Sequence, residues 1–175
     1  MRKLLILASL LWVNGTFAQD YCKQIKKEVT DNNTSFNYES PYKDDNPPAV
    51  RAMRSYSTGE TEFDNFNLIF FIPCDFSDLL VKTAEGEMEK EETKIVIVFD
   101  DNSKITDDTI AISHDRRESG YAARMVYFPV TPQNIKNLTT KKIAKFHLAA
   151  AEATVTAEMA TAIQQYIICL KDVKK

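Results

Sequence analysis

The chain has 175 residues, of which 44% are hydrophobic, 10% are aromatic and 27% are charged. These proportions exclude a disordered or collagen-like chain and fit one globular domain with a sizeable core. With 22 basic and 25 acidic residues the formal charge is −3, so phosphate binding gains nothing from net charge and nucleic acid is not an expected partner.

The N-terminal residues have the three-part pattern of a secretory signal peptide. Arg2 and Lys3 precede a largely apolar run over residues 4–13, and small residues follow it. Ten residues are too few to span a bilayer, which needs about 20. We therefore expect residues 1–18 to be removed as a signal peptide. Residues 19–175 are then expected to form a single exported domain, periplasmic or secreted, with no transmembrane helix.

The start of the mature chain carries an apolar repeat and then a polar stretch. Tyr21, Ile25 and Val29 recur every four residues and would share one face of a helix. Turn-forming residues from Asp31 onward predict the end of this helix. Residues 34–48 are polar and close with two prolines, which predicts a surface loop.

Seven segments are rich in β-branched and aromatic residues and predict strands. In chain order they cover residues 50–57, 63–72, 75–84, 94–99, 104–113, 121–130 and 141–149. The second has consecutive apolar residues from Leu68 onward, so we expect it to be central and covered on both faces, with Pro73 ending it. Turn-forming residues at 100–103 join the fourth and fifth segments into a predicted hairpin. Residues 114–120 are expected to be a polar connection, and residues 133–139 a loop or one helical turn.

The C-terminal segment has the clearest helical pattern. Thr156 is a suitable N-cap, and Glu158 lies in the first turn, where the helix dipole favours negative charge. The apolar side chains recur at helical spacing and form one stripe: Met159, Ile163, Tyr166, Ile167 and Leu170. The connections between predicted strands are too short for parallel crossovers. The predicted fold class is therefore α+β, a mainly antiparallel β-sheet with a C-terminal amphipathic helix packed on one face.

Three cysteines follow the leader: Cys22, Cys74 and Cys169. Export into an oxidising compartment predicts one disulfide and one remaining thiol, with three pairings open. The pairing of Cys22 with Cys169 is favoured because domain termini often lie close together and because it closes the longest loop. Three reduced thiols are the alternative.

The densest group of reactive side chains is His114, Asp115, Arg116, Arg117 and Glu118. A histidine beside carboxylates can act as a base, and paired arginines can hold an anion. We take His114, Arg116 and Arg117 as candidate ligand-binding residues, with a solvated turn as the alternative. No nucleophile motif accompanies them, so no catalytic residue is assigned.

Three tyrosines surround the proline-rich stretch: Tyr38, Tyr42 and Tyr56. Tyrosine provides contact area at low entropic cost, so these residues are a candidate recognition patch. The alternative is that they cover the edge of the sheet.

The predicted turn after residue 99 contains Asp100, Asp101 and Asn102, which are candidate calcium ligands. The EF-hand pattern fails because Ile105 occupies the place that requires glycine. An ordinary hairpin turn is the alternative. No cysteine or histidine stands at zinc-ligand spacing, and no glycine-rich phosphate loop occurs, so no cofactor is expected.

Export, an adequate core and the lack of a catalytic motif favour a non-enzymatic binding or interaction domain of the bacterial cell envelope. The sheet or the tyrosine-bearing loop would be its contact surface. Two alternatives stay open. One is a small hydrolase with a site around His114, and the other is an oligomeric structural component of the envelope.

Overall fold

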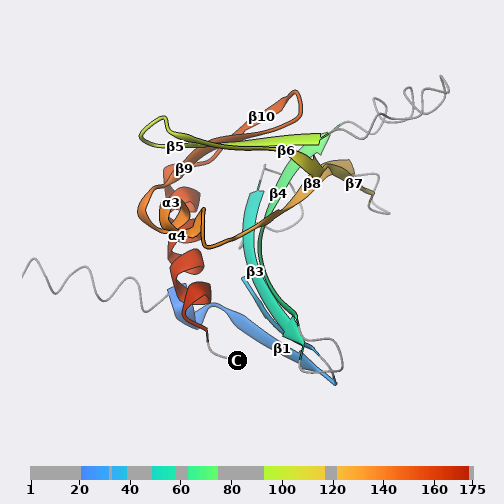
Figure 1. Cartoon of the computed structure of the whole chain (residues 1–175), viewed down its shortest axis with the longest axis vertical. Coiled ribbons are helices and arrows are strands. Elements are labelled where there is room, and N and C mark those ends of the chain that lie inside the picture. The colour runs from blue at the N-terminus through green and yellow to red at the C-terminus, as the bar shows by residue number, and fades with distance from the viewer. Residues whose placement is uncertain are drawn as a thin grey trace, which may run out of the picture.

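The computed structural model describes residues 21–31, 33–38, 49–57, 63–74, 93–116 and 122–173. The leader and the strand predicted at 75–84 lie outside these residues. Within the described residues, antiparallel strands form two sheets, with helices α3 (Ile135–Thr140) and α4 (Ala157–Lys171) beside them (Figure 1). The α+β fold class is therefore confirmed.

Each sheet is a ladder of antiparallel neighbours. The larger sheet has the order β1 (Lys26–Thr30), β2 (Asn33–Asn37), β3 (Ala49–Ser57), β4 (Phe63–Cys74), β8 (Ala122–Pro129) and β7 (Ser113–Arg116). The smaller sheet has the order β10 (Ala151–Thr154), β9 (Ile143–Leu148), β5 (Thr93–Phe99) and β6 (Lys104–Ala111). The predicted hairpin of β5 and β6 and the central position of β4 are confirmed.

One residue carries the chain from the smaller sheet into the larger one. β6 ends at Ala111, β7 begins at Ser113, and Ile112 between them is buried. The two sheets and α4 enclose a single core. Its largest fully buried side chains come from both sheets and both helices: Tyr166, Phe70, Phe99, Phe146, Leu68 and Leu138.

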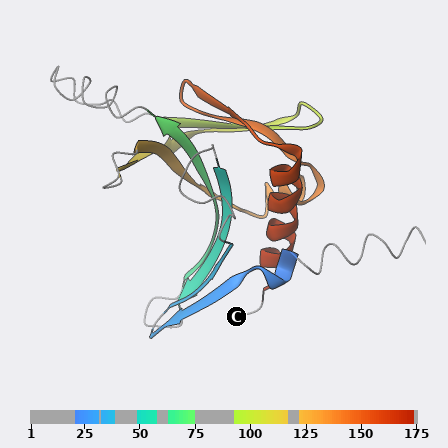
Figure 2. The same cartoon turned by 180° about the vertical axis from the view of Figure 1, so that it is seen from behind.

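Helix α4 lies where the sequence predicts it. The Oγ1 of Thr156 accepts a 3.2 Å hydrogen bond from the backbone N–H of Met159, and Glu158 and Lys171 stand at the ends that the dipole favours. The apolar stripe of α4 is buried, and the helix packs against β3 and β9 (Figures 1 and 2). In both views β3 and β4 bow toward α4, so the opposite face of the larger sheet is the hollow side of their curve.

Arg54 on β3 fastens the C-terminal end of α4 to the larger sheet. Its Nη1 donates hydrogen bonds to the carbonyl oxygens of Leu170 at 2.8 Å and Lys171 at 2.9 Å. Its Nε and Nη2 donate to the two carboxylate oxygens of Asp64 at 3.0 and 2.9 Å. The last carbonyls of a helix lack intrahelical partners, so an arginine from the sheet can satisfy them. The hydrogen-bonded Asp64 also raises the pKa of the Arg54 guanidinium.

A disulfide joins the two ends of the described chain. Cys22 and Cys169 are linked across 147 positions, with their Cα atoms 5.4 Å apart. This is the pairing that the sequence favoured. Cys74, at the end of β4, lies outside the disulfide and is half-buried.

The N-terminal segment differs from the prediction. Only residues 21–23 are helical, and the chain then forms β1, so the helix predicted through Val29 is wrong. β2 occupies residues that were expected to be a loop. The turn residues that begin at Asp31 close a β1–β2 hairpin instead of ending a helix. Both kinds of element end in such residues, so the turn signal alone does not distinguish them.

Pro73 does not end β4, because the strand continues to Cys74. The pairing of β4 with β3 stops at Phe71, while the pairing with β8 continues through Pro73 and Cys74. One side of β4 is therefore unpaired at this end among the described strands. Proline is tolerated in a strand where its missing N–H faces an open edge.

β9 and β10 form a hairpin, and β10 was not predicted from the sequence. The turn between Leu148 and Ala151 places Ala149 at φ 51°, a left-handed conformation that favours glycine. Ala149→Gly is expected to raise the free energy of unfolding by roughly 0.5–1 kcal/mol, because relief of this strain outweighs the entropy that glycine loses on folding. Urea unfolding measures the change. Ala150→Gly, at a position without positive φ, should be destabilising, and a loss of stability in both variants would contradict the strain argument.

Candidate functional site

The histidine and arginines predicted as ligand-binding residues lie partly in a strand. Residues 113–116 form β7, so the polar connection predicted from His114 to residue 120 is wrong over its first three residues. An edge strand tolerates polar residues, because one of its sides is open to solvent. His114 is half-buried and stands opposite Arg124 on β8, while Arg116 stands opposite Ala122. Arg117 lies outside the described residues.

The residue opposite His114 is therefore a cation and not a carboxylate. A general base is usually oriented by a hydrogen-bonded third group, commonly a carboxylate, and the ladder does not place one opposite His114. Imidazole and guanidinium side chains in one row are of the kind that can hold an anion. The ligand-binding role of His114 and Arg116 stays a prediction.

Two of the three candidate tyrosines have structural partners. Tyr56 is 5% exposed, and its ring lies 5.8 Å from that of Phe36. Tyr38 stacks on Tyr166 of α4, with ring centroids 3.5 Å apart. Tyr42 lies outside the described residues. The structure therefore uses Tyr38 and Tyr56 for packing, which leaves little of Tyr56 for a ligand to contact.

Tyr166 is the centre of a small aromatic cluster. The ring of Tyr21 meets it edge-on at 5.5 Å, and its hydroxyl donates a 2.6 Å hydrogen bond to the Oε1 of Gln24. Burial, together with the neighbouring Tyr38, raises the pKa of the Tyr166 hydroxyl. Together with the disulfide, this cluster holds the start of the chain against α4.

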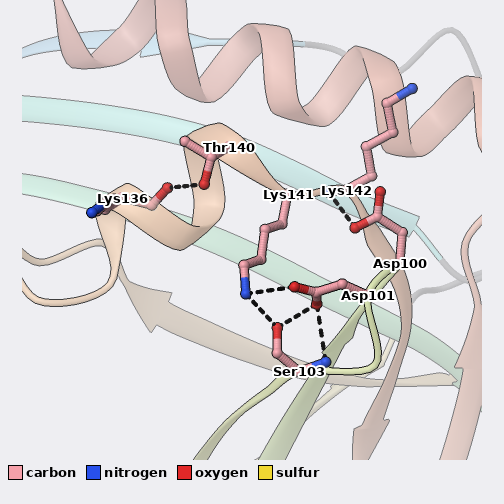
Figure 3. A network of polar contacts seen from close by, with 7 residues as sticks. All are labelled: Asp100, Asp101, Ser103, Lys136, Thr140, Lys141 and Lys142. Carbon is pink, nitrogen blue, oxygen red and sulfur yellow. Dashed lines mark hydrogen bonds and ion pairs between the residues drawn. The ribbon is translucent and has the colours of Figure 1, made fainter.

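The candidate calcium ligands lie in the turn between β5 and β6, where a lysine already supplies the positive charge. The Nζ of Lys141 lies 2.7 Å from Asp101 Oδ2 and donates a 2.7 Å hydrogen bond to the Oγ of Ser103 (Figure 3). The Oδ1 of Asp101 accepts hydrogen bonds from the hydroxyl and backbone N–H of Ser103. Asp100 contacts Lys142, the residue after Lys141. The backbone N–H of Asp100 donates a 2.9 Å hydrogen bond to the carbonyl oxygen of Lys142.

This network ties the β5–β6 turn to the start of β9. Asn102 adopts φ 63°, which asparagine tolerates in a turn. Among the described residues, no group of three histidine, cysteine or acidic side chains is close enough to hold a metal ion. The arrangement around Asp101 is that of a structural turn, and the proposed calcium site gains no support from it.

The Asp101 contacts predict a pH dependence. Hydrogen bonds from Lys141 and Ser103 lower the pKa of the Asp101 carboxyl from its usual value to about 2. A depressed pKa means that stabilisation is complete above pH 4 and is lost as the pH falls toward 2. Asp101→Asn is therefore expected to lower the melting temperature at pH 7, with a difference from the wild type that shrinks between pH 4 and pH 2. Thermal melts followed by circular dichroism measure it, and a difference independent of pH would contradict this account.

A different surface stands out on the hollow side of the larger sheet. Side chains alternate along strands, so the neighbours of the buried residues Ala52, Leu68 and Val126 point away from the core. These outward residues form what we call the outer-face patch: Arg51, Met53, Ile69, Phe71, Met125 and Tyr127. None of them belongs to the core cluster.

The patch is continuous across three strands. Ile69 stands opposite Arg51 on β3 and Tyr127 on β8, and Phe71 stands opposite Met125. The guanidinium of Arg51 lies 5.0 Å from the centroid of the Phe71 ring, within cation–π range. Tyr127 is 48% exposed, Ile69 is buried, and the other four side chains are half-buried.

An antiparallel sheet with one covered face usually turns polar residues to the other. Here the other face carries aromatic, methionine and arginine side chains, the types enriched at protein interfaces. The sequence held a signal for this face in the consecutive apolar residues of β4, which predicted that both faces of this strand are covered. Among the described residues, the helices and the smaller sheet cover only one face.

The fold and this surface define a class, a disulfide-linked α+β domain with two antiparallel sheets and an apolar outer face. The chain matches no protein-family model, no curated protein and no solved structure. Within the described residues, neither helix is long and apolar enough to cross a membrane.

Proposed function

We propose that this chain is an exported, non-enzymatic binding domain that holds a partner protein of the cell envelope against the outer-face patch. The patch is the observation that carries this proposal. Tyr127, on the β8 side of the patch, is exposed, and the strands hold the arginine and aromatic side chains of the patch in register. The patch lies on the face of the sheet opposite the buried residues Ala52, Leu68 and Val126.

The support is physical. Burial of apolar surface drives most protein association, and tyrosine, methionine and arginine are favoured at the centres of interfaces. Strands of a sheet fixed by a core, a disulfide and a helix hold these side chains in place, so little ordering entropy opposes binding. The leader pattern supports export and hence an envelope or extracellular partner.

Site-specific photo-cross-linking tests the proposal. A photo-reactive residue placed at Tyr127 in the producing cells is expected to capture one defined partner protein, while the same residue at Thr106, an exposed position on β6, should not. The captured partner is then purified, and its binding to the wild-type chain is measured by calorimetry.

Tyr127→Ala is expected to weaken that binding at least about tenfold, since truncation of an interface hot spot costs about 2 kcal/mol or more. Thr106→Ala is the matched control and should bind as the wild type does. Equal capture at both positions, or unchanged affinity of the Tyr127→Ala variant for the captured protein, would refute the proposal.

A further inference from the structure

The outer edge of β1 pairs with no strand of the described residues. β1 is the end strand of the larger sheet, and among the described strands it pairs only with β2. All five of its side chains are exposed, and the apolar Val29 is 66% exposed. Both views show β1 at the end of the molecule away from the smaller sheet (Figures 1 and 2). An open edge presents backbone donors and acceptors to another strand.

The edge is held in place before any partner arrives. The disulfide at Cys22 and the ring contact of Tyr21 with Tyr166 fix the residues just before β1. Within the hairpin, the Nζ of Lys27 lies 5.7 Å from the centroid of the Phe36 ring. Pairing with a fixed strand costs less ordering entropy than pairing with a mobile one.

The hairpin register determines which backbone groups point outward. Thr30 and Asn33 flank a two-residue turn and form the pair whose backbone groups face each other. Such pairs alternate along an antiparallel ladder. The backbone N–H and C=O groups of Lys27 and Val29 therefore face the open edge, where an added strand would meet them, and Asp31 follows directly after β1 in the turn.

We propose that a second copy of this chain pairs with β1 antiparallel, about a two-fold axis at Val29. In this register Val29 stands opposite Val29 of the second copy, Lys27 opposite Asp31, and Glu28 opposite Thr30. Two opposite-charge pairs and one apolar pair then form, and each stabilises an antiparallel ladder. The six-stranded sheets of the two copies become one continuous sheet.

The two registers shifted toward the start of β1 are disfavoured by charge. An axis at Glu28 places two glutamates directly opposite each other, and an axis at Lys27 places two lysines opposite each other. Like charges directly across a ladder are destabilising. Among the registers centred on residues 27–29, only the one centred on Val29 opposes no like charges. The same reasoning makes a second copy a better occupant than an unrelated strand, since the chain itself supplies the complementary charges.

A charge-swap series tests the pairing by sedimentation equilibrium on the full chain after leader removal. The wild type is expected to dimerise reversibly. Lys27→Glu and Asp31→Lys should each weaken dimerisation at least about tenfold, because each turns two attractive pairs into repulsive ones. The double variant with both changes should restore it. Lys104→Glu, at an exposed lysine of the edge strand β6, is the matched control and should change nothing.

Cysteine trapping tests the register and does not depend on a stable dimer. In a Cys74→Ser background, Val29→Cys should form a disulfide between two copies, because directly paired Cα atoms lie within disulfide range. Glu28→Cys should not, because Glu28 faces Thr30 of the second copy. Circular dichroism checks that each variant is folded.

A monomer at all concentrations with no trapping at Val29, or a double swap that fails to restore dimers lost in the single swaps, would overturn the proposal. Equal trapping at Val29 and Glu28 would also overturn the register. The outer-face patch is on another part of the sheet, so its cross-linking experiment can fail or succeed independently of this one.

Discussion

Replacing both Cys22 and Cys169 with serine is expected to lower the free energy of unfolding by about 5 kcal/mol. The disulfide joins cysteines that are 147 positions apart in the sequence, and the chain-entropy model gives that value for a loop of this length. The loss comes mainly from the unfolded chain, which gains freedom when the link is removed. The aromatic contacts of Tyr166 stay in place, so the variant should still fold.

Urea unfolding followed by far-UV circular dichroism measures this loss. Cys74→Ser is the control, because Cys74 lies outside the disulfide, and it should change stability far less. A doubly substituted chain that unfolds at the same urea concentration as the wild type would contradict the expected role of the link. Addition of a reductant to the wild type should reproduce the double variant, since it removes the same constraint.

Arg54→Met is expected to cost about 3 kcal/mol of stability. The substitution removes four charge-assisted hydrogen bonds, two to Asp64 and two to the last carbonyls of α4. A hydrogen bond to a charged group is worth about 1.5–3 kcal/mol, but three of these four are exposed to water and contribute much less, and methionine recovers part of the packing. The half-buried carboxylate of Asp64 is left without its arginine.

The same strand offers a matched control. Arg51 lies on the opposite face of β3, and its buried Nε has no hydrogen-bond acceptor among the described residues. Arg51→Met removes an unsatisfied donor together with the cation–π contact to Phe71, and these two effects have opposite signs, so stability should change by less than about 1 kcal/mol. Urea unfolding compares the two variants. Equal losses of stability in the two variants would contradict the expected contribution of the Arg54 hydrogen bonds.

The parts of the fold that sequence reasoning predicted are those with local signals. Helix α4 carries a cap, a charged end and an apolar stripe within one short segment, and the β5–β6 hairpin carries a strand pattern on each side of a strong turn. The β1–β2 hairpin was missed because four-residue spacing in a short segment fits a helix equally well. The hairpin forms strands because β2 pairs with β3, and β3 follows the proline-rich stretch in the sequence. A short segment read alone does not contain this information.

The candidate site was predicted less well because its parts come from distant positions. The outer-face patch joins β3, β4 and β8, and only their register brings Arg51, Phe71 and Tyr127 to one face. The bend at Ile112 that divides the strands between two sheets has no local signal either. The tyrosines near the proline-rich stretch are chemically suited to recognition. Tyr56 is nevertheless buried, and its burial could not be predicted from the residues next to it in the sequence.

The order in which the three cysteines emerge has a consequence for biosynthesis. The export that we propose would carry the chain into an oxidising compartment N-terminus first, so Cys22 and Cys74 would arrive long before Cys169. An oxidant that acts during translocation would then join Cys22 to Cys74, a linkage absent from the native fold. The thiolate of Cys169, which arrives last, must then attack the sulfur of Cys22 and release Cys74 as a thiolate by thiol–disulfide exchange. Under the proposed export, maturation of this chain should therefore depend on a disulfide isomerase or on oxidation that waits for the C-terminus.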